Sequence, residues 1–191
     1  MYILATNNKS KVLELRALLC DIDKKVYGLY ELGISHVPNE TGKTFHENAE
    51  IKCREIVKYI DIEYTAILSD DSGLVIEALD GLPGVDTANF LGDISWEERN
   101  LGIVNLMKNE KNRRAKFICI IAALFFDGSI KFAKGEIDCE IAHAPKGDNG
   151  FGFDPIMFLP EFNCTSAELD ITQKNKISAR GLAARNLLKI L

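Results

Sequence analysis

The sequence lacks the features of exported, disulfide-bonded or membrane-spanning proteins. Its five cysteines, among 191 residues, include no Cys-x-x-Cys pair, so neither a disulfide framework nor a zinc site is expected. The longest apolar run, 117–126, is about half the ~20 residues of a membrane-spanning helix. No basic stretch precedes the short apolar start of the chain. These absences predict a reduced, cytoplasmic protein that binds no membrane.

Positive charge is also scarce. The chain has 23 Lys and Arg against 28 Asp and Glu, a net charge of −5. This balance argues against sequence-independent binding of nucleic acid. A small anionic ligand would therefore need a local basic pocket or a cation. The three histidines lack the spacing of metal ligands, and no Ser/His/Asp or Cys/His set suggests nucleophilic catalysis.

Composition and apolar periodicity predict a folded α/β protein. With 47% hydrophobic and 27% charged residues, the chain can bury one substantial core, and we expect a single domain over residues 1–191. Helices are expected from Asn8, from Thr44 and from Ser95, and one helix containing Ile177 and Leu182 is expected to close the chain. Strands are expected at 2–6, 26–29, 65–68, 74–79, 115–126, 129–133, 136–143 and 156–159. The fold class is a mixed, partly antiparallel sheet with flanking helices.

A first candidate anion site lies at a strand-to-helix junction. Thr6, Asn8 and Lys11 stand where free backbone N–H groups and the helix dipole favour a negative ligand. The glycines of a Walker A loop are missing. The alternative, equally weighted on spacing alone, is that Asn8 only caps the helix.

Two adjacent carboxylates, Asp70 and Asp71, follow an apolar strand. Acidic residues at a sheet end can hold Mg²⁺ together with substrate phosphates, and Glu40 is a candidate second ligand. The residues alone slightly favour the alternative, in which Asp70 and Asp71 form a solvated turn before Gly73.

A glycine-rich loop, 147–155, contains two alternating aromatic residues. Phe151 or Phe153 could stack a flat ring while Asp154 accepts a hydrogen bond from its edge. The alternative is that the phenylalanines anchor the loop in the core.

Two basic clusters have no obvious partner in the sequence. Taken alone, each is expected to be a solvated face or loop. They are Lys174, Lys176 and Arg180 near the start of the last helix, and Lys111, Arg113, Arg114 and Lys116 in a loop.

The order of these motifs is more specific than any one of them. The chain resembles the inosine triphosphate pyrophosphatase family, also called XTP/dITP diphosphatases, over nearly its whole length. The motifs that carry the resemblance are Thr6-x-Asn8-x-x-Lys11, Glu40-Thr41-Gly42-x-x-Phe45-x-Glu47-Asn48-Ala49, Asp70-Asp71-Ser72-Gly73-Leu74, Leu82-Pro83-Gly84, Gly150-Phe151-Gly152-Phe153-Asp154-Pro155 and Lys174-x-x-x-Ser178-x-Arg180-Gly181.

The resemblance implies an elongated α/β fold with two lobes around a central cleft. It implies a homodimer that hydrolyses the purine nucleoside triphosphates ITP, dITP and XTP to the monophosphate and pyrophosphate with Mg²⁺. Glu40 and Asp71 would hold the metal, and Asp71 would also activate the attacking water. The implied substrate contacts are Thr6, Asn8, Lys11 and Lys52 for the phosphates, Ser72 beside them, and Phe151, Gly152, Phe153, Asp154, Lys174 and Arg180 for the base.

This assignment implies a base selectivity, and two positions of the chain depart from the family pattern. Arg180 only donates hydrogen bonds, so a 6-oxo purine would suit it better than the 6-amino group of adenine. Ala179 stands where the family usually has His, and Asn89 where it often has a basic residue. The alternative function is therefore a non-catalytic nucleotide-binding protein, whereas retention of Glu40 and Asp71 favours an enzyme.

Overall fold

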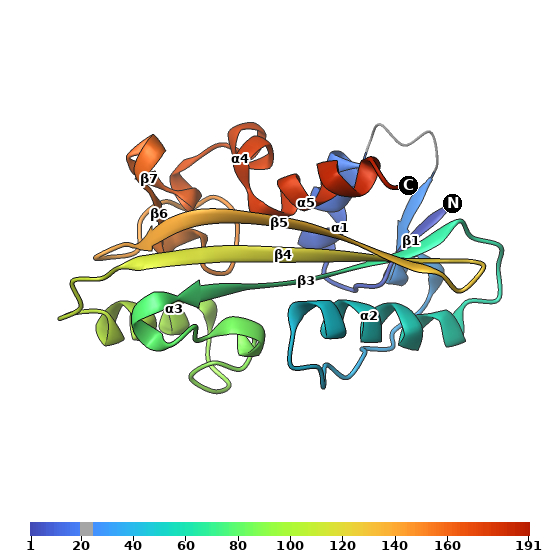
Figure 1. Cartoon of the computed structure of the whole chain (residues 1–191), viewed down its shortest axis with the longest axis horizontal. Helices are drawn as coiled ribbons and strands as arrows, with labels where there is room; N and C mark the ends of the chain where they lie inside the picture. Colours follow the sequence, from blue (N-terminus) through green and yellow to red (C-terminus); the bar gives the residue numbers. More distant parts are fainter. Residues whose placement is uncertain (20–24) are drawn as a thin grey trace. The chain divides into compact units, whose positions relative to one another are not determined.

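The computed structural model describes residues 1–19 and 25–191, and these form two compact units. Unit 1 consists of Met1–Asp71, Cys119–Gly135 and Ala179–Leu191, and unit 2 of Ser72–Ile118 and Glu136–Ser178. Three long strands contribute residues to both units (Figure 1): β3 (Ala66–Ile76), β4 (Arg114–Phe125) and β5 (Ile130–Ile141). The expectation of one domain over residues 1–191 stays a prediction. Cys20 lies outside the described residues.

The strands form a seven-stranded mixed sheet in the order β2-β1-β3-β4-β5-β6-β7, which confirms the predicted fold class. Strand β1 pairs in parallel with β2 and β3, whereas β6 pairs antiparallel with β5 and β7. The shorter strands are β1 (Tyr2–Leu4), β2 (Val26–Gly28), β6 (Met157–Leu159) and β7 (Cys164–Thr165).

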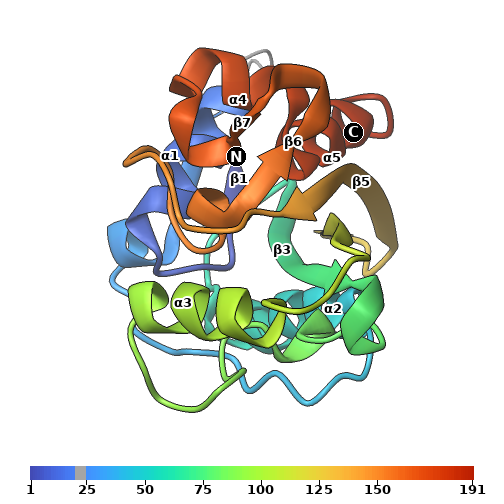
Figure 2. The ribbon, with the colours of Figure 1, turned by 90° about the vertical axis from the view of Figure 1, so that its left-hand side faces the viewer.

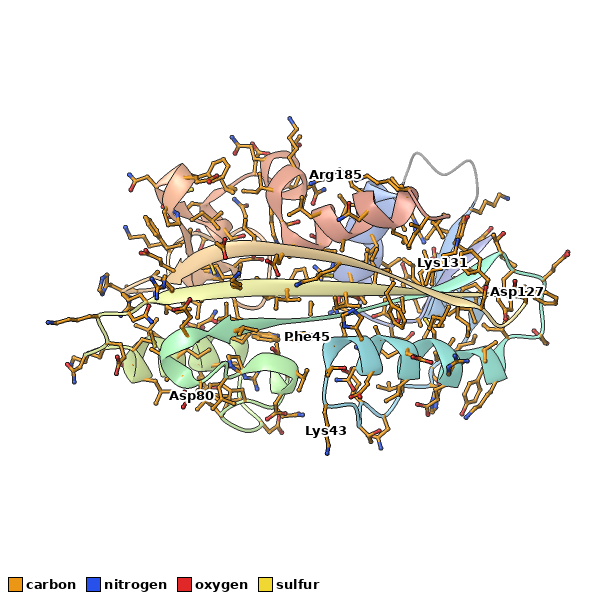
Figure 3. All side chains as sticks on the ribbon, viewed as in Figure 1. Lys43, Phe45, Asp80, Asp127, Lys131 and Arg185 are labelled. Atoms are coloured by element: carbon orange, nitrogen blue, oxygen red, sulfur yellow. The ribbon has the colours of Figure 1, made fainter. Side chains whose placement is uncertain are left out.

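The predicted hairpin between β4 and β5 is confirmed. Asp127 and Lys131 lie at its end (Figure 3). The N–H of Phe125 donates to the carbonyl of Ser129 at 2.9 Å, and Gly128 has a φ of 84°. Glycine adopts that left-handed backbone without steric cost, which is why Asp-Gly predicts this turn.

Unit 1 contains the helices α1 (Lys9–Leu18), α2 (Phe45–Ile56) and α5 (Ala179–Leu188). Within this unit α2 covers one face of the sheet, and α1 and α5 lie together on the other (Figures 1 and 2). The capping box of Thr44 and Glu47 begins α2 as predicted. Helix α2 fully buries Cys53 and Ile56, because its apolar side chains recur on the face toward the sheet.

Unit 2 contains α3 (Trp96–Leu106) and α4 (Ile171–Ile177) on opposite sides of its part of the sheet (Figure 2). The capping box of Ser95 and Glu98 begins α3 as predicted. The core of this unit consists of buried residues from strands, helices and the glycine-rich loop, namely Leu74, Ile76, Ile103, Met107, Ala115, Cys139, Ile141, Phe153, Ile156, Met157, Leu159 and Leu169. Short 3-10 helices lie at Leu29–Leu32, Val57–Tyr59, Glu77–Leu79, Gly84–Asp86, Asp154–Ile156, Pro160–Phe162 and Ser166–Glu168.

Three element predictions are wrong. The expected strands at 129–133 and 136–143 are one strand, β5. The chain closes with two helices, since Ser178 leaves the helical conformation with φ −60° and ψ 150° and so separates α4 from α5. The expected strands at 65–68 and 74–79 are one strand, β3, which ends at Ile76 and is followed by a 3-10 helix. Asp70 and Asp71 therefore lie inside a strand.

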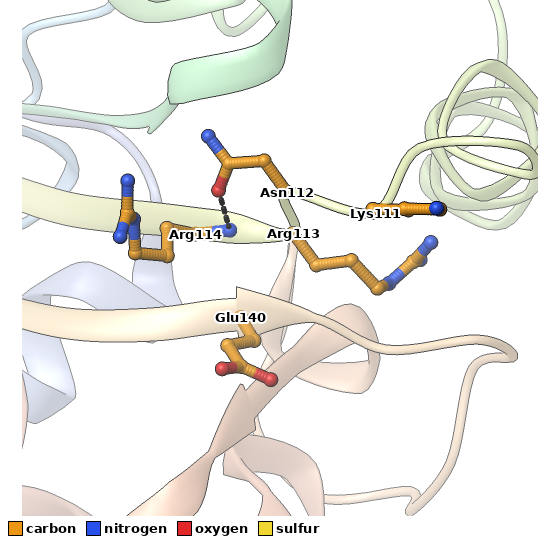
Figure 4. Close-up of a pocket in the computed structure, with 5 residues that line it drawn as sticks. All are labelled: Lys111, Asn112, Arg113, Arg114 and Glu140. Carbon is orange, nitrogen blue, oxygen red and sulfur yellow. Dashed lines mark hydrogen bonds between the residues drawn. The ribbon is translucent and has the colours of Figure 1, made fainter.

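The basic cluster at 111–116 is not a solvated loop as predicted. Arg113 is buried and its guanidinium donates to the carbonyls of Met107, Ile141 and Ala142. Arg114 begins β4 and pairs with Glu77 at 2.9 Å. Figure 4 shows that the two arginine side chains point away from each other and that the backbone N–H of Arg114 donates to the side-chain oxygen of Asn112. Within residues 1–19 and 25–191, no helix is long and apolar enough to cross a membrane.

Candidate functional site

The start of α1 is organised by its capping residue. The Asn8 side-chain oxygen accepts from the N–H groups of Ser10 (3.0 Å) and Lys11 (3.2 Å). The Thr6 hydroxyl oxygen in turn accepts from the Asn8 N–H at 3.2 Å. The capping alternative is therefore confirmed for Asn8, and an anion at this helix end would use the Thr6 hydroxyl, the remaining N–H groups and Lys11.

Asp70 is the centre of a buried charge network in unit 1. Its Oδ2 lies 3.1 Å from Lys11 Nζ and 3.0 Å from Arg180 Nη2, and Arg180 Nη1 donates to Glu14 at 2.6 Å. Burial by itself would raise the pKa of Asp70, but the charges of Lys11 and Arg180 hold it well below its usual range. Asp70 is 3% exposed, so the prediction of a solvated turn is wrong.

Asp71 faces a different cation, because successive residues of a strand point to opposite faces. Lys52 Nζ, from α2, lies 2.8 Å from Asp71 Oδ1, 3.0 Å from Glu40 Oε2 and 3.1 Å from the Asp70 carbonyl oxygen. Asn48, one helical turn before Lys52, donates from Nδ2 to Asp71 Oδ2 at 3.3 Å. One ammonium group thus draws two carboxylates together.

The protonation of Asp71 is tuned by this cluster. Burial raises the pKa of Asp71 to about 6, and the negative charge of Glu40 adds to the rise while Lys52 opposes it. Two ionised carboxylates facing one ammonium leave the cluster with one excess negative charge, which would attract a cation.

The donor set of Glu40 and Asp71 fits Mg²⁺. Among the described residues no three His, Cys, Asp or Glu side chains converge in the way a protein-only metal site requires. Mg²⁺ does not require one, because it binds through one or two carboxylates and completes its shell with water and substrate phosphates. Both carboxylates contact the same Lys52 nitrogen, so the fold brings the two side chains to one place in unit 1.

In unit 2, Asp154 orders the glycine-rich loop. Its Oδ2 accepts from Lys174 Nζ at 2.6 Å and from the Phe151 N–H at 2.8 Å, and its Oδ1 accepts from the Ser166 hydroxyl at 2.7 Å. Lys174 Nζ also lies 5.2 Å from the centroid of the Phe151 ring. Lys174 is 6% exposed, so its prediction as part of a solvated face is wrong.

The two aromatic residues of the loop differ in exposure. Phe153 is 2% exposed and lies in the core of unit 2, as the core-anchor alternative predicted. Phe151 is half-buried and remains the accessible ring of the pair. Gly152 between them has a φ of 66°, a conformation that favours glycine.

The remaining predicted positions are placed as follows. Ser72 is half-buried and follows Asp71 in β3. Ala179 is buried at the first position of α5. Asn89 is exposed and donates to Asp86 Oδ1 at 3.2 Å.

Three residues of these networks were missed by the sequence analysis. Glu14 lies three residues after Lys11, and Asn48 four residues before Lys52, so helical spacing alone could have placed each beside its predicted lysine. Ser166 has no such signal, since only the tertiary fold brings it to Asp154.

The chain is similar to known proteins over nearly its whole length. The model of the Ham1 family matches residues 2–190. The dITP/XTP pyrophosphatase of Clostridium tetani is 40% identical over 179 residues, which cover 93% of this chain and 89% of that protein.

Two solved structures also match over nearly the whole chain. A HAM1 protein from Coxiella burnetii has a TM-score of 0.88 at 36% identity and covers 99% of this chain and 96% of its own. The nucleoside-triphosphatase, or dITP/XTP pyrophosphatase, of Mycobacterium abscessus has a TM-score of 0.74 at 32% identity. The match covers 100% of this chain and 99% of that protein's chain. On sequence and fold together, this chain belongs to the Ham1 family.

Proposed function

We propose that this protein hydrolyses the non-standard purine nucleoside triphosphates dITP, XTP and ITP to the monophosphate and pyrophosphate. The observation that carries the proposal is the buried Lys52 with Glu40 and Asp71 on its ammonium group. The names of the relatives support the substrate class. Together these favour an enzyme over a protein that only binds nucleotides.

The phosphates are proposed to bind in unit 1. Lys11 has a side chain that is 21% exposed, so a triphosphate can compete with Asp70 for its charge. Lys52 is buried and already surrounded by oxygens, and an ordered ammonium of this kind stabilises negative charge without first having to be desolvated. Thr6 and the N–H groups at the start of α1 would donate further hydrogen bonds to the phosphates, and Asn8 holds this helix end in place.

Glu40 and Asp71 are proposed to hold Mg²⁺. When bound, the ion would polarise the phosphoryl group and neutralise its charge. The proposed base is the ionised Asp71 carboxylate, which accepts one proton from the attacking water as the α–β anhydride bond breaks. Lys52 and Asn48 each donate to one Asp71 oxygen, which fixes the carboxylate. Burial makes it a stronger base than an exposed aspartate.

The base of the substrate is proposed to bind in unit 2, whereas Ser72 would contact the substrate beside Asp71, its neighbour in β3. Phe151 would offer its ring and the backbone of Gly152 its polar groups, while Asp154 and Lys174 hold the loop in shape. Phe153 would support this surface from the core. Arg180 stays a predicted base contact, and its guanidinium also donates to Asp70 and Glu14.

We also propose that the protein acts in the cytoplasm as a homodimer. The scattered cysteines of the sequence and the family resemblance support this proposal.

The test is pyrophosphate release from dITP with Mg²⁺. Asp71→Asn should lower kcat by about 100-fold or more, because it removes the base and one metal ligand. Asp61→Asn is the matched control, since Asp61 is an exposed aspartate of the same unit. Release of orthophosphate in place of pyrophosphate, or equal turnover by the Asp71 variant, would contradict the proposal. Binding of dITP by the folded protein without any turnover would support the non-catalytic alternative.

A further inference from the structure

Trp96 is the one tryptophan of the sequence and lies at the first position of α3. Its side chain is 40% exposed, yet unit 2 holds it from several directions. The Phe153 ring meets it edge to face with centroids 5.1 Å apart, and the Arg99 guanidinium carbon lies 4.9 Å from its ring centroid. Trp96 is therefore a fixed aromatic surface.

Arg99 is itself immobilised beneath this ring. It is 4% exposed, and its guanidinium donates to the carbonyls of Phe90 (2.7 Å) and Gly92 (2.8 Å). The cation is thus desolvated where it contacts the indole, which is where a cation–π contact is strongest. Little side-chain entropy remains to be lost when a ligand packs on Trp96.

The same helix face holds the glycine-rich loop. Asn100 is one turn after Trp96 on α3, and its Nδ2 donates to the Gly152 carbonyl at 2.9 Å. The far edge of the indole lies 3.9 Å from the position that a Cβ on Gly152 would take. Asn100 is 3% exposed, and its Oδ1 has no hydrogen-bond partner among residues 1–19 and 25–191. Because this oxygen is itself buried, an ordered water molecule is the partner that would satisfy it.

Phe153 is too buried to stack on a substrate base, whereas Trp96 beside it is partly exposed. Phe153 was expected to stack on the substrate base, but it is 2% exposed and its ring is packed in the core. Trp96 packs on Phe153, and its own ring is partly exposed to solvent. Phe151 and Trp96 are therefore the two accessible rings beside Gly152.

We propose that Trp96 is a specificity-determining residue that stacks on the purine base of the substrate, with Asn100 as a positioning residue that holds Gly152 against it. This inference rests on the proposed function for the identity of the ligand. Stacking on a fixed ring is tolerant of ring substituents, and any preference among bases comes from stacking strength. Because a two-ring purine covers more of the indole than a one-ring pyrimidine does, Trp96 would favour purines and leave recognition of the 6-oxygen to polar groups.

Intrinsic fluorescence tests the contact directly, because Trp96 is the single tryptophan. In the intact protein without Mg²⁺, added inosine monophosphate should quench the emission in a saturable manner, whereas cytidine monophosphate should do so only at much higher concentration. Inorganic pyrophosphate, which lacks a base, should leave the emission unchanged. Equal responses to all three, or no response to inosine monophosphate, would overturn the proposal.

Kinetics with variants provide a second measurement. Trp96→Ala should raise KM for dITP about tenfold with kcat changed less than twofold, and Trp96→Phe should restore most of the loss. Leu106→Ala is the matched control, since Leu106 is a 50% exposed residue of the same helix. An unchanged KM in Trp96→Ala, or a loss of kcat that Trp96→Phe does not restore, would overturn the proposal.

These outcomes separate the two proposals. A wild-type protein that releases pyrophosphate from dITP but shows neither the quenching nor the KM effect contradicts only the role of Trp96. A protein whose emission is quenched by inosine monophosphate but that hydrolyses no triphosphate contradicts the enzyme and retains the purine contact.

Discussion

Asp71 sets the pH dependence expected of the reaction. Its burial raises the pKa from 3.8 to about 6, and only the ionised carboxylate accepts a proton. At low Mg²⁺, kcat/KM for dITP should therefore rise with pH through about 6 and fall on acidification, since this ratio reports the free enzyme. Saturating Mg²⁺ favours the ionised form and should move the midpoint to lower pH. A profile that is flat between about pH 5 and pH 8, or a midpoint unmoved by Mg²⁺, would exclude Asp71 as the base.

Residue-level chemistry was only partly predictable from the sequence. The motifs named Asp71, Lys52 and Asp154, but their partners come from distant segments. Asp70 and Arg180, for example, are 110 residues apart in the chain. Side-chain pairing of this kind depends on the tertiary fold. The sequence alone therefore predicted a solvated turn at Asp70 and a solvated face at Lys174.

At the level of elements, the packing of α5 on β5 depends on Gly135. A Cβ at this position would overlap the backbone of Ala179 and Ala183 in α5. Gly135→Ala should therefore lower the free energy of unfolding by about 3 kcal/mol, because backbone cannot move aside as a side chain can. Gly102→Ala in α3 is the control. It meets only the side chain of Leu91 and gains helix propensity, so its effect should stay within about 1 kcal/mol.

Urea denaturation, monitored by circular dichroism, measures the free energy of unfolding of both glycine variants. We expect a lower urea concentration at the midpoint of unfolding for Gly135→Ala and a midpoint near that of the wild type for Gly102→Ala. Equal midpoints for the two variants would show that the contact between α5 and β5 is looser than the structure describes.

Local signals predicted the elements whose ends they form. The capping boxes at Thr44 and Ser95 and the Asp-Gly turn at 127–128 are contained within a few residues, and each is where it was predicted. The extent of β3 is different. Its Asp-Asp-Ser-Gly stretch has the composition of a turn, but the strand continues to Ile76. Strand β1 pairs only with Ala66–Leu68, so the neighbour that supports the rest of β3 is the long strand β4. The break at Ser178 was likewise hidden, because apolar residues continue on both sides of it.

For the whole molecule, fold class and family could be predicted because they depend on the order of motifs along the chain. The mixed seven-stranded sheet and the match to the Ham1 family over residues 2–190 confirm both. The departure at Ala179 concerns base selectivity and the one at Asn89 concerns phosphate binding, and both properties depend on how all groups around the substrate act together. Substrate preference therefore has to be measured on the intact protein.

The most direct test of the proposed function is pyrophosphate release from dITP, XTP, ITP, ATP and GTP, measured side by side with and without Mg²⁺. We predict Mg²⁺-dependent release, with kcat/KM for dITP or XTP roughly 100-fold or more above the values for ATP and GTP. Comparable rates on all five nucleotides would contradict the assignment of base selectivity, and the absence of release from any of them would contradict the assignment of the enzyme.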